Sequence, residues 1–252
     1  HDAKVHCFGG CDWKTVRDAL LARGCAAYSA DDLDDAPPAR DTNKKPVPAD
    51  DWEIVSPVPD DAPFPEAKFR DYPPPTTYWE YLNENRKLLF YVFRFDLPGG
   101  GKDVIPQTLW RHKETGALQW RWKAYPELRP MYNLHKIAAH PDRPVSVMEG
   151  EKATDAAAKL FPDHVIITSS GGCNAVDKTD WSPLKGRDVI VWPDADGPGR
   201  KYAQDVARRA HKAGASSVKI LPVLDGKPEG WDAADAVAEG WTPEQAAEYL
   251  AT

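Results

Sequence analysis

The spacing of apolar and polar positions changes near Pro144. Upstream, alternation over residues 88–95 and 119–123 predicts strands of a small antiparallel sheet, with a turn at 98–101. Downstream, short apolar runs alternate with amphipathic stretches, which predicts a parallel sheet with helices on its faces. The expected strands there are 145–148, 165–168, 188–192 and 218–223, and the expected helices are 152–160, 200–213 and two short ones from Trp231 and Pro243.

The amino-terminal part differs from both in its residue composition. Residues 6–23 predict a turn followed by an amphipathic helix. Residues 29–71 contain eight prolines and few aliphatic side chains. Because proline removes a backbone donor and interrupts regular elements, this stretch is expected to be a linker or an irregular arm that follows the surface.

Charge is distributed as unevenly as hydrophobicity. The chain of 252 residues has a formal net charge of −7, yet residues 86–136 carry +6, with aromatic residues between the basic ones. A protein coated all over by nucleic acid is therefore excluded, whereas a local basic groove is not. Four cysteines are too few for a disulfide scaffold, and no apolar run of about 18 residues or signal-peptide pattern occurs. A cytoplasmic protein without a membrane segment is expected.

Two acidic motifs follow predicted strands. Glu149 comes directly after the strand that ends at Met148, and Asp194 and Asp196 follow the strand that ends at Trp192. Chemistry in open parallel sheets gathers at the carboxyl ends of the strands. Carboxylates held together there repel one another unless a hard cation such as Mg²⁺ neutralises them. Alternative interpretations are acidic residues at a helix start for Glu149 and a polar turn for Asp194.

Other common motifs are missing or incomplete. Read as a calcium loop, the segment from Asp194 has Pro198 at its fifth position and Asp205 at its twelfth, where a bidentate Glu is needed. The sequence contains no Walker phosphate-binding loop, GxSxG elbow or HExxH pair.

With these residues in view, the stretch 145–223 resembles a Toprim domain. The strand ending in Glu149-Gly150 and the strand ending in Asp194-Ala195-Asp196 are similar to the two motifs of that family. The strings 149–152, 192–200 and 230–235 are similar to Toprim domains of phage and mobile-element primases. The resemblance implies metal ligation by Asp194, Asp196 and Asp232, with Asp235 as the second choice for the third position. Glu149 would complete the cluster or act as an acid or base, and Mg²⁺ or Mn²⁺ would be the cofactor.

The upstream residues extend this resemblance to the primase core of the bacterial and phage DnaG-like family. Residues 89–95, Lys102 and 131–134 follow the order of the basic subdomain that precedes the Toprim domain in such primases. That subdomain discriminates primases from topoisomerases and Toprim nucleases. The basic residues that would contact nucleic acid or nucleotide phosphates are Arg94, Lys102, Arg121, Lys136, Lys152 and Arg200. The aromatic residues Phe93, Phe95, Trp120 and Trp122 are expected to be sheet core more than base-stacking surfaces.

The beginning of the chain is similar to the second half of a primase zinc-binding module. Cys7 and Cys11 match the second ligand pair, with His6 nearby, whereas the first pair is absent. Structural zinc needs four ligands, so we expect little or no bound zinc without the intact module. Cys25 and Cys173 are expected to be ordinary thiols.

The combined expectation is a DNA primase core. It would synthesise RNA primers by nucleotidyl transfer from ribonucleoside triphosphates on a single-stranded DNA template, with a replicative helicase in cis or in trans. The alternatives are a Toprim-type DNA nuclease and a non-catalytic DNA-binding module of a larger primase-helicase. The expected organisation is a zinc-module remnant with a helix at 1–28, the acidic arm at 29–71, a basic subdomain at 72–143 and a Toprim domain with carboxy-terminal helices at 144–252.

Overall fold

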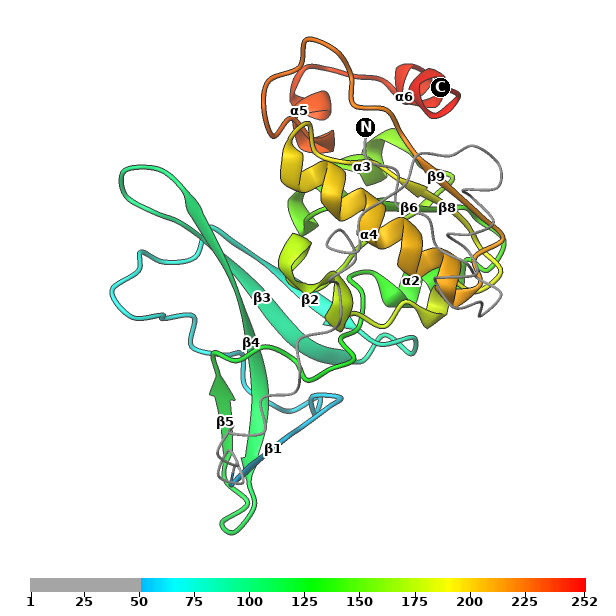
Figure 1. The fold of residues 1–252 in the computed structure, drawn as a ribbon. Helices are drawn as coiled ribbons and strands as arrows, with labels where there is room; N and C mark the ends of the chain where they lie inside the picture. Colours follow the sequence, from blue (N-terminus) through cyan, green and yellow to red (C-terminus); the bar gives the residue numbers. More distant parts are fainter. Residues whose placement is uncertain (1–50) are drawn as a thin grey trace, which may run out of the picture. The chain divides into compact units, whose positions relative to one another are not determined.

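Residues 51–252 are described by a computed structural model, which contains two separate sheets, with the helices gathered around one of them (Figure 1). Both sheets belong to one compact unit. Of the expectations above, those on Cys7, Cys11, His6, Cys25 and the helix at 6–23 lie outside the described residues.

The first sheet is antiparallel. Its strands are β1 (Trp52–Ile54), β2 (Thr77–Leu82), β3 (Leu88–Asp96), β4 (Lys102–His112) and β5 (Leu118–Arg121). Their order is β1-β4-β3-β2, and β5 also pairs with β4. The first half of β4 pairs with β3, and its second half pairs with β1 and β5. The pattern predicted β3 and β5 but not β4, because Pro106, a residue usually kept out of strand interiors, stands in the middle of β4 opposite Val92.

Both faces of β3 are buried, which explains its run of aromatic residues. On one face Phe90 packs with Trp79 and Tyr81 of β2. On the other, Tyr91, Phe93 and Phe95 are covered by the arm, which contains no helix or strand between Ile54 and Thr77. The indole nitrogens of β5 and its neighbour donate to this arm, Trp120 to the Pro63 carbonyl at 2.9 Å and Trp122 to the Lys68 carbonyl at 3.0 Å. Phe93 and Phe95 are therefore core, as expected, and Trp120 and Trp122 are partly buried against them.

The second sheet is parallel, with the order β7-β6-β8-β9. Its strands are β6 (Val145–Met148), β7 (Val165–Thr168), β8 (Asp188–Val191) and β9 (Ser217–Ile220). All four residues of β6 and of β7 are buried, as expected for strands with both faces covered. β9 ends before the predicted 223, because Pro222 has no amide hydrogen with which to continue the ladder.

Helices cover the two faces of this sheet. The α-helices are α2 (Leu134–Ala139), α3 (Glu151–Leu160), α4 (Gly197–Ala213), α5 (Ala233–Ala238) and α6 (Pro243–Leu250), with 3₁₀ turns η2 (Gly172–Lys178) and η3 (Ser182–Leu184). On one face α4 buries Tyr202, Ala203 and Val206 against the valines of β6 and β8. On the other, α3, α5 and α6 pack around Trp192. The expected α/β fold class, a parallel sheet preceded by a mainly antiparallel part, is confirmed.

No helix within residues 51–252 is long and apolar enough to cross a membrane.

Candidate active site

The two acidic motifs meet at one edge of the parallel sheet. β6 and β8 are neighbours in parallel register, with Val147 opposite Val191. Glu149 follows the end of β6, and Asp194 follows the end of β8. A third acidic group arrives on the loop before α5, because the Ala195 amide donates to the Trp231 carbonyl at 2.9 Å. This contact brings Asp232 beside the other two motifs.

A tight turn holds the two aspartates after β8. The Asp196 amide donates to the Asp194 carbonyl at 2.8 Å, and Asp196 Oδ1 accepts a hydrogen bond from the Gly199 amide at 2.6 Å. Asp196 is thereby the N-cap of α4, which begins at Gly197, three residues earlier than the pattern predicted. A Cβ on Gly199 would lie 2.5 Å from the Asp194 carbonyl oxygen, which is too close for any residue with a side chain. Glycine at this position therefore allows the first turn of α4 to approach the loop.

Asp232 and Asp235 form a capping box at the start of α5. Asp232 Oδ1 accepts from the amides of Ala234 at 2.7 Å and Asp235 at 3.1 Å, and Asp235 Oδ2 accepts from the Asp232 amide at 3.1 Å. Asp235 therefore has a structural role that orients Asp232. Of the two residues considered for the third acidic position, the structure favours Asp232, whose charge acts on both Glu149 and Asp194.

The carboxylates are close enough to change one another's proton affinity. Burial, followed by the charges of Glu149, Asp232 and Asp196, raises the pKa of Asp194 to about 8. Burial and the charge of Asp196 also raise the pKa of Glu149. Its Oε2 atom is buried without a hydrogen-bond partner. A buried acceptor with no donor is costly, so this edge of the sheet carries electrostatic strain that a cation or a proton relieves.

The chemistry of the donor set fits a hard divalent cation such as Mg²⁺ or Mn²⁺, because carboxylate oxygens are the ligands that these ions prefer. Within residues 51–252, however, no three His, Cys, Asp or Glu side chains gather closely enough to hold one ion. Convergence of Glu149, Asp194 and Asp196 within reach of one or two divalent ions therefore stays a prediction, and the described residues do not show three ligands gathered around one point. The physical reason is twofold: uncompensated carboxylates repel one another, and Asp196 turns one oxygen to the amide of Gly199.

Lys102 is the basic residue of the antiparallel sheet that reaches this site. It stands at the first position of β4, and its charge lowers the pKa of Glu149, Asp194 and Glu151 against the larger raising effects. Arg94 forms an ion pair with Asp96 at 2.7 Å instead.

The other basic candidates are spread over the molecule. Arg121 lies over the rings of Trp52 and Trp110, and its partner Thr108 is six residues, about 20 Å, along β4 from Lys102. Lys136 is half-buried in α2, while Lys152 and Arg200 are exposed in the first turns of α3 and α4. The structure thus brings Lys102 to the carboxylates and leaves Arg121 far along the sheet.

Four residues near the carboxylates had no functional prediction from the sequence. The Tyr202 hydroxyl donates to the Met148 carbonyl at 2.9 Å and so holds α4 to the end of β6. The Tyr81 hydroxyl donates at 2.7 Å to the fully buried Glu151, two residues after Glu149. Cys173, expected to be an ordinary thiol, lies near Glu149, and burial together with the charge of Glu149 raises the pKa of its thiol. Only Glu151 had a signal, since it lies inside the string 149–152.

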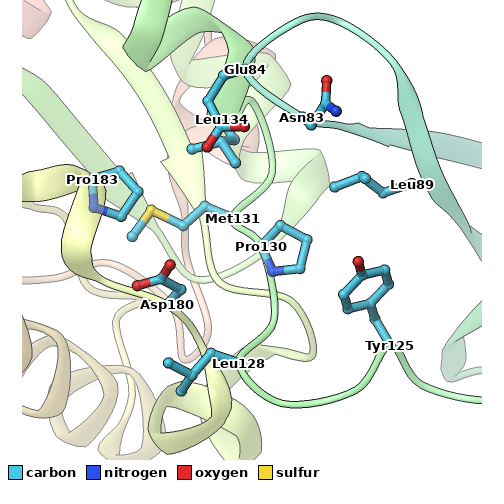
Figure 2. A pocket seen from close by; sticks show the side chains of 10 residues that line it. All are labelled: Asn83, Glu84, Leu89, Tyr125, Leu128, Pro130, Met131, Leu134, Asp180 and Pro183. Atoms are coloured by element: carbon cyan, nitrogen blue, oxygen red, sulfur yellow. The ribbon is translucent and has the colours of Figure 1, made fainter. Parts of the chain in front are cut away.

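A cavity of about 240 Å³ lies away from the carboxylates. Figure 2 shows its lining, in which Glu84 and Asp180 stand among apolar side chains such as Met131 and Pro183. A second cavity of about 510 Å³ is lined by the arm and the β2–β3 hairpin. Neither includes Glu149 or Asp194, so the candidate site lies outside both of these cavities.

Comparison with solved structures found primase catalytic domains. The chain is 14% identical to the zinc-binding and RNA polymerase domains of the Aquifex aeolicus primase, over 68% of this chain and 38% of that one, with a TM-score of 0.48. The chain is also 14% identical to a DNA primase domain from Pseudomonas aeruginosa, over 73% of this chain and 52% of that one, with a TM-score of 0.45. It is 15% identical to a DnaG primase catalytic domain bound to ssDNA, over 69% of this chain and 50% of that one, with a TM-score of 0.41. The chain thus spans about 38% to half of the length of these proteins.

No curated protein matches the sequence. One family model does, and it matches residues 70–195, from the end of the arm through β8 to the turn that carries Asp194. This range is half of the chain and includes Glu149 and Lys102. The chain belongs to the family described as Domain of unknown function (DUF6371).

Proposed function

We propose that this chain is a primase-type nucleotidyl transferase, which joins ribonucleotides on a single-stranded DNA template. The observation that carries the proposal is the group of mutually coupled carboxylates at the carboxyl edge of the parallel sheet, where the charge of Lys102 from the antiparallel sheet lowers the pKa of Glu149 and of Asp194. Carboxylates in this arrangement are suited to bind divalent cations, and the lysine is suited to bind a nucleotide phosphate. The resemblance of the motifs to Toprim primases supports the same reaction.

The residues have distinct roles in the proposed reaction. Asp194, Asp196 and Asp232 would hold Mg²⁺, which when bound supplies charge neutralisation at the reacting phosphate. Glu149 is the proton acceptor for the attacking 3′ hydroxyl, because its Oε2 has no hydrogen-bond donor and its raised pKa brings its proton affinity closer to neutrality. Lys102 compensates the charge of the triphosphate and keeps it beside the carboxylates.

Lys102 also distinguishes primer synthesis from DNA cleavage by the same acidic residues. A nuclease needs one phosphodiester and water at the carboxylates, whereas a polymerase must also bind the two further phosphates of the incoming nucleotide. Lys102, at the start of β4 after the β3–β4 hairpin, is the residue that we propose for that purpose, because its charge acts on Asp194. It comes from the sheet whose +6 segment predicted nucleic-acid contact.

Primer synthesis on a single-stranded template with labelled ribonucleotides tests this proposal. The full chain is expected to extend dinucleotides in Mg²⁺ or Mn²⁺, and Asp194→Asn is expected to lower the rate by roughly 10²–10³-fold, since it removes charge stabilisation at the reacting phosphate. Asp188→Asn is the matched control. It changes an exposed aspartate at the opposite end of the same strand and should leave the rate unchanged.

The other outcomes point to the alternatives. Cleavage of the template without synthesis, abolished by Asp194→Asn, would replace the proposal with a nuclease. DNA binding with neither reaction would make the chain a non-catalytic module. Equal loss of synthesis in Asp188→Asn and Asp194→Asn would show that synthesis does not depend specifically on the assigned carboxylates.

A further inference from the structure

The outer face of α4 carries a stripe of basic side chains. The helix buries Tyr202, Ala203, Val206 and Ala210 against the sheet, three or four residues apart. Its exposed positions follow the same period on the opposite side: Arg200, Lys201, Gln204, Arg208, His211 and Lys212. Because these side chains are not packed against other residues within 51–252, they are available to bind a partner.

These charges have little compensation. Within α4 five Lys or Arg residues face a single acid, Asp205, which pairs with Arg208. Among the described residues, no ion pair joins Lys201 or Lys212 to a carboxylate. Lys185, also exposed, extends the stripe, since its Cγ would lie 3.6 Å from a Cβ on Gly214 at the end of the helix.

The opposite face of the same sheet carries charges of both signs. α6 exposes Glu244 and Glu248, whereas α3 exposes Lys152, Asp155 and Lys159. The outer face of α4 differs from it, because its exposed charged side chains are all basic. A surface of one sign attracts a polyanionic partner.

The stripe begins at the candidate site. α4 starts at Gly197, directly after Asp196, and Figure 1 shows it as one long helix that leads away from this point. From Arg200 to Lys212 the helix rises about 18 Å, which matches about five phosphates of one nucleic-acid strand at 3.4 Å each. A strand bound at the carboxylates therefore has a basic surface along which to continue.

We propose that the exposed face of α4 binds the phosphodiester backbone of nucleic acid that passes the candidate site, without regard to base sequence. This rests on the proposed function only in that the site handles nucleic acid. It adds a contact surface separate from the antiparallel sheet and Lys102. Contacts from lysine and arginine to phosphates carry no sequence information, and each such contact releases counterions, so the binding is expected to be strongly salt-dependent.

The test compares two double variants of the full chain. Lys201→Glu with Lys212→Glu reverses two stripe charges, and Lys68→Glu with Lys159→Glu makes the same change in net charge elsewhere, on the arm and on α3. All four lysines are exposed. Binding of a 20-nucleotide oligo(dT) and of a 20-base-pair duplex is measured by fluorescence anisotropy at several salt concentrations.

The stripe variant is expected to bind oligo(dT) about 25-fold more weakly at 0.1 M salt, with the slope of log K against log salt reduced by about 1.4. Each lost single-strand contact lowers the slope by about 0.7, and each duplex contact by about 0.9. Whichever ligand shows the loss identifies the form of nucleic acid that lies on α4. The control variant should match the wild type.

Unchanged affinity and slope in the stripe variant would overturn the inference, as would an equal loss in the control or no DNA binding by the wild type. Lys201→Gln with Lys212→Gln repeats the test with half the charge change if the reversed pair fails to fold. Failure of the proposed function is a separate result, because the wild type would then bind DNA through α4 and make no primer.

Discussion

The two sheets use their side chains in opposite ways. In the antiparallel sheet β3 is covered on both faces, and its conspicuous residues serve mainly structure: Phe93 and Phe95 are core, and Arg94 pairs with Asp96. In the parallel sheet the strand interiors are plain aliphatic, and the acidic residues stand just beyond the strand ends. Strand interiors stabilise the fold, whereas strand ends and the turns that follow them are free to carry charge.

The largest expected effect concerns the pH dependence of stability, which tests whether the acidic residues beyond the strand ends act on one another. The folded-state pKa of Asp194, about 8, lies far above that of an exposed aspartate. The folded protein then retains a proton that the unfolded chain releases, so stability falls as pH rises from about 4 to about 8. Asp194→Asn removes this loss. At pH 8.5, in urea without divalent ions, the variant should be roughly 3–5 kcal/mol more stable than the wild type.

At pH 5 the same difference should be much smaller, and Asp188→Asn should show none at either pH. Added Mg²⁺ should stabilise the wild type at pH 8.5 and have little effect on Asp194→Asn, because the ion relieves the same repulsion. A wild-type protein whose stability does not decrease between pH 5 and pH 8.5 would contradict the proximity of these carboxylates.

The turn after β8 offers the next largest effect. Gly199→Ala places a Cβ at 2.5 Å from the Asp194 carbonyl oxygen and 2.9 Å from its amide nitrogen, so the loop or α4 must shift. We expect a loss of about 1–3 kcal/mol of stability together with loss of primer synthesis. Gly197→Ala is the matched control, since nothing lies within 4 Å of its added Cβ. Similar behaviour of the two variants in thermal unfolding and activity assays would refute the close approach.

The hydrogen bond that Tyr81 of β2 donates to Glu151 of α3 is expected to have a similar effect on stability. Tyr81→Phe leaves the buried Glu151 without its donor, which should reduce stability by about 1–3 kcal/mol. Tyr78→Phe, on the same strand with its ring 47% exposed, should be neutral. Chemical denaturation measures both. If the two substitutions cost the same, the Tyr81–Glu151 contact does not hold β2 to α3.

The smallest effect concerns the arm. Phe64 is 55% exposed and touches Tyr78, Tyr91 and Phe93 edge to face. Phe64→Ala should cost about 1 kcal/mol and leave oligo(dT) binding unchanged, because the sheet aromatics are core. Ala62→Gly, a small change on the same arm, serves as the control. Tighter DNA binding by Phe64→Ala would instead show that the arm covers a base-stacking surface.

The sequence was sufficient where local pattern and burial agree. The strands 145–148 and 165–168 were predicted to the residue, because continuous apolar runs bounded by turn residues have one good solution between two layers of helices. The first turn of α4 was missed because Gly197, Pro198 and Gly199 disfavour a helix locally. The Asp196 cap and the room made by Gly199 overcome that preference.

The sequence by itself determined the fold class, the two acidic motifs and the charge contrast between residues 86–136 and the rest of the chain, since each depends on residue type and spacing. Only the tertiary structure decided which charges act together. Lys102 joins the carboxylates while Arg121 lies over two tryptophans, and Asp232 enters through the Ala195–Trp231 hydrogen bond. Electrostatic coupling depends on distance and burial in space, and residues distant along the chain acquire both only when it folds.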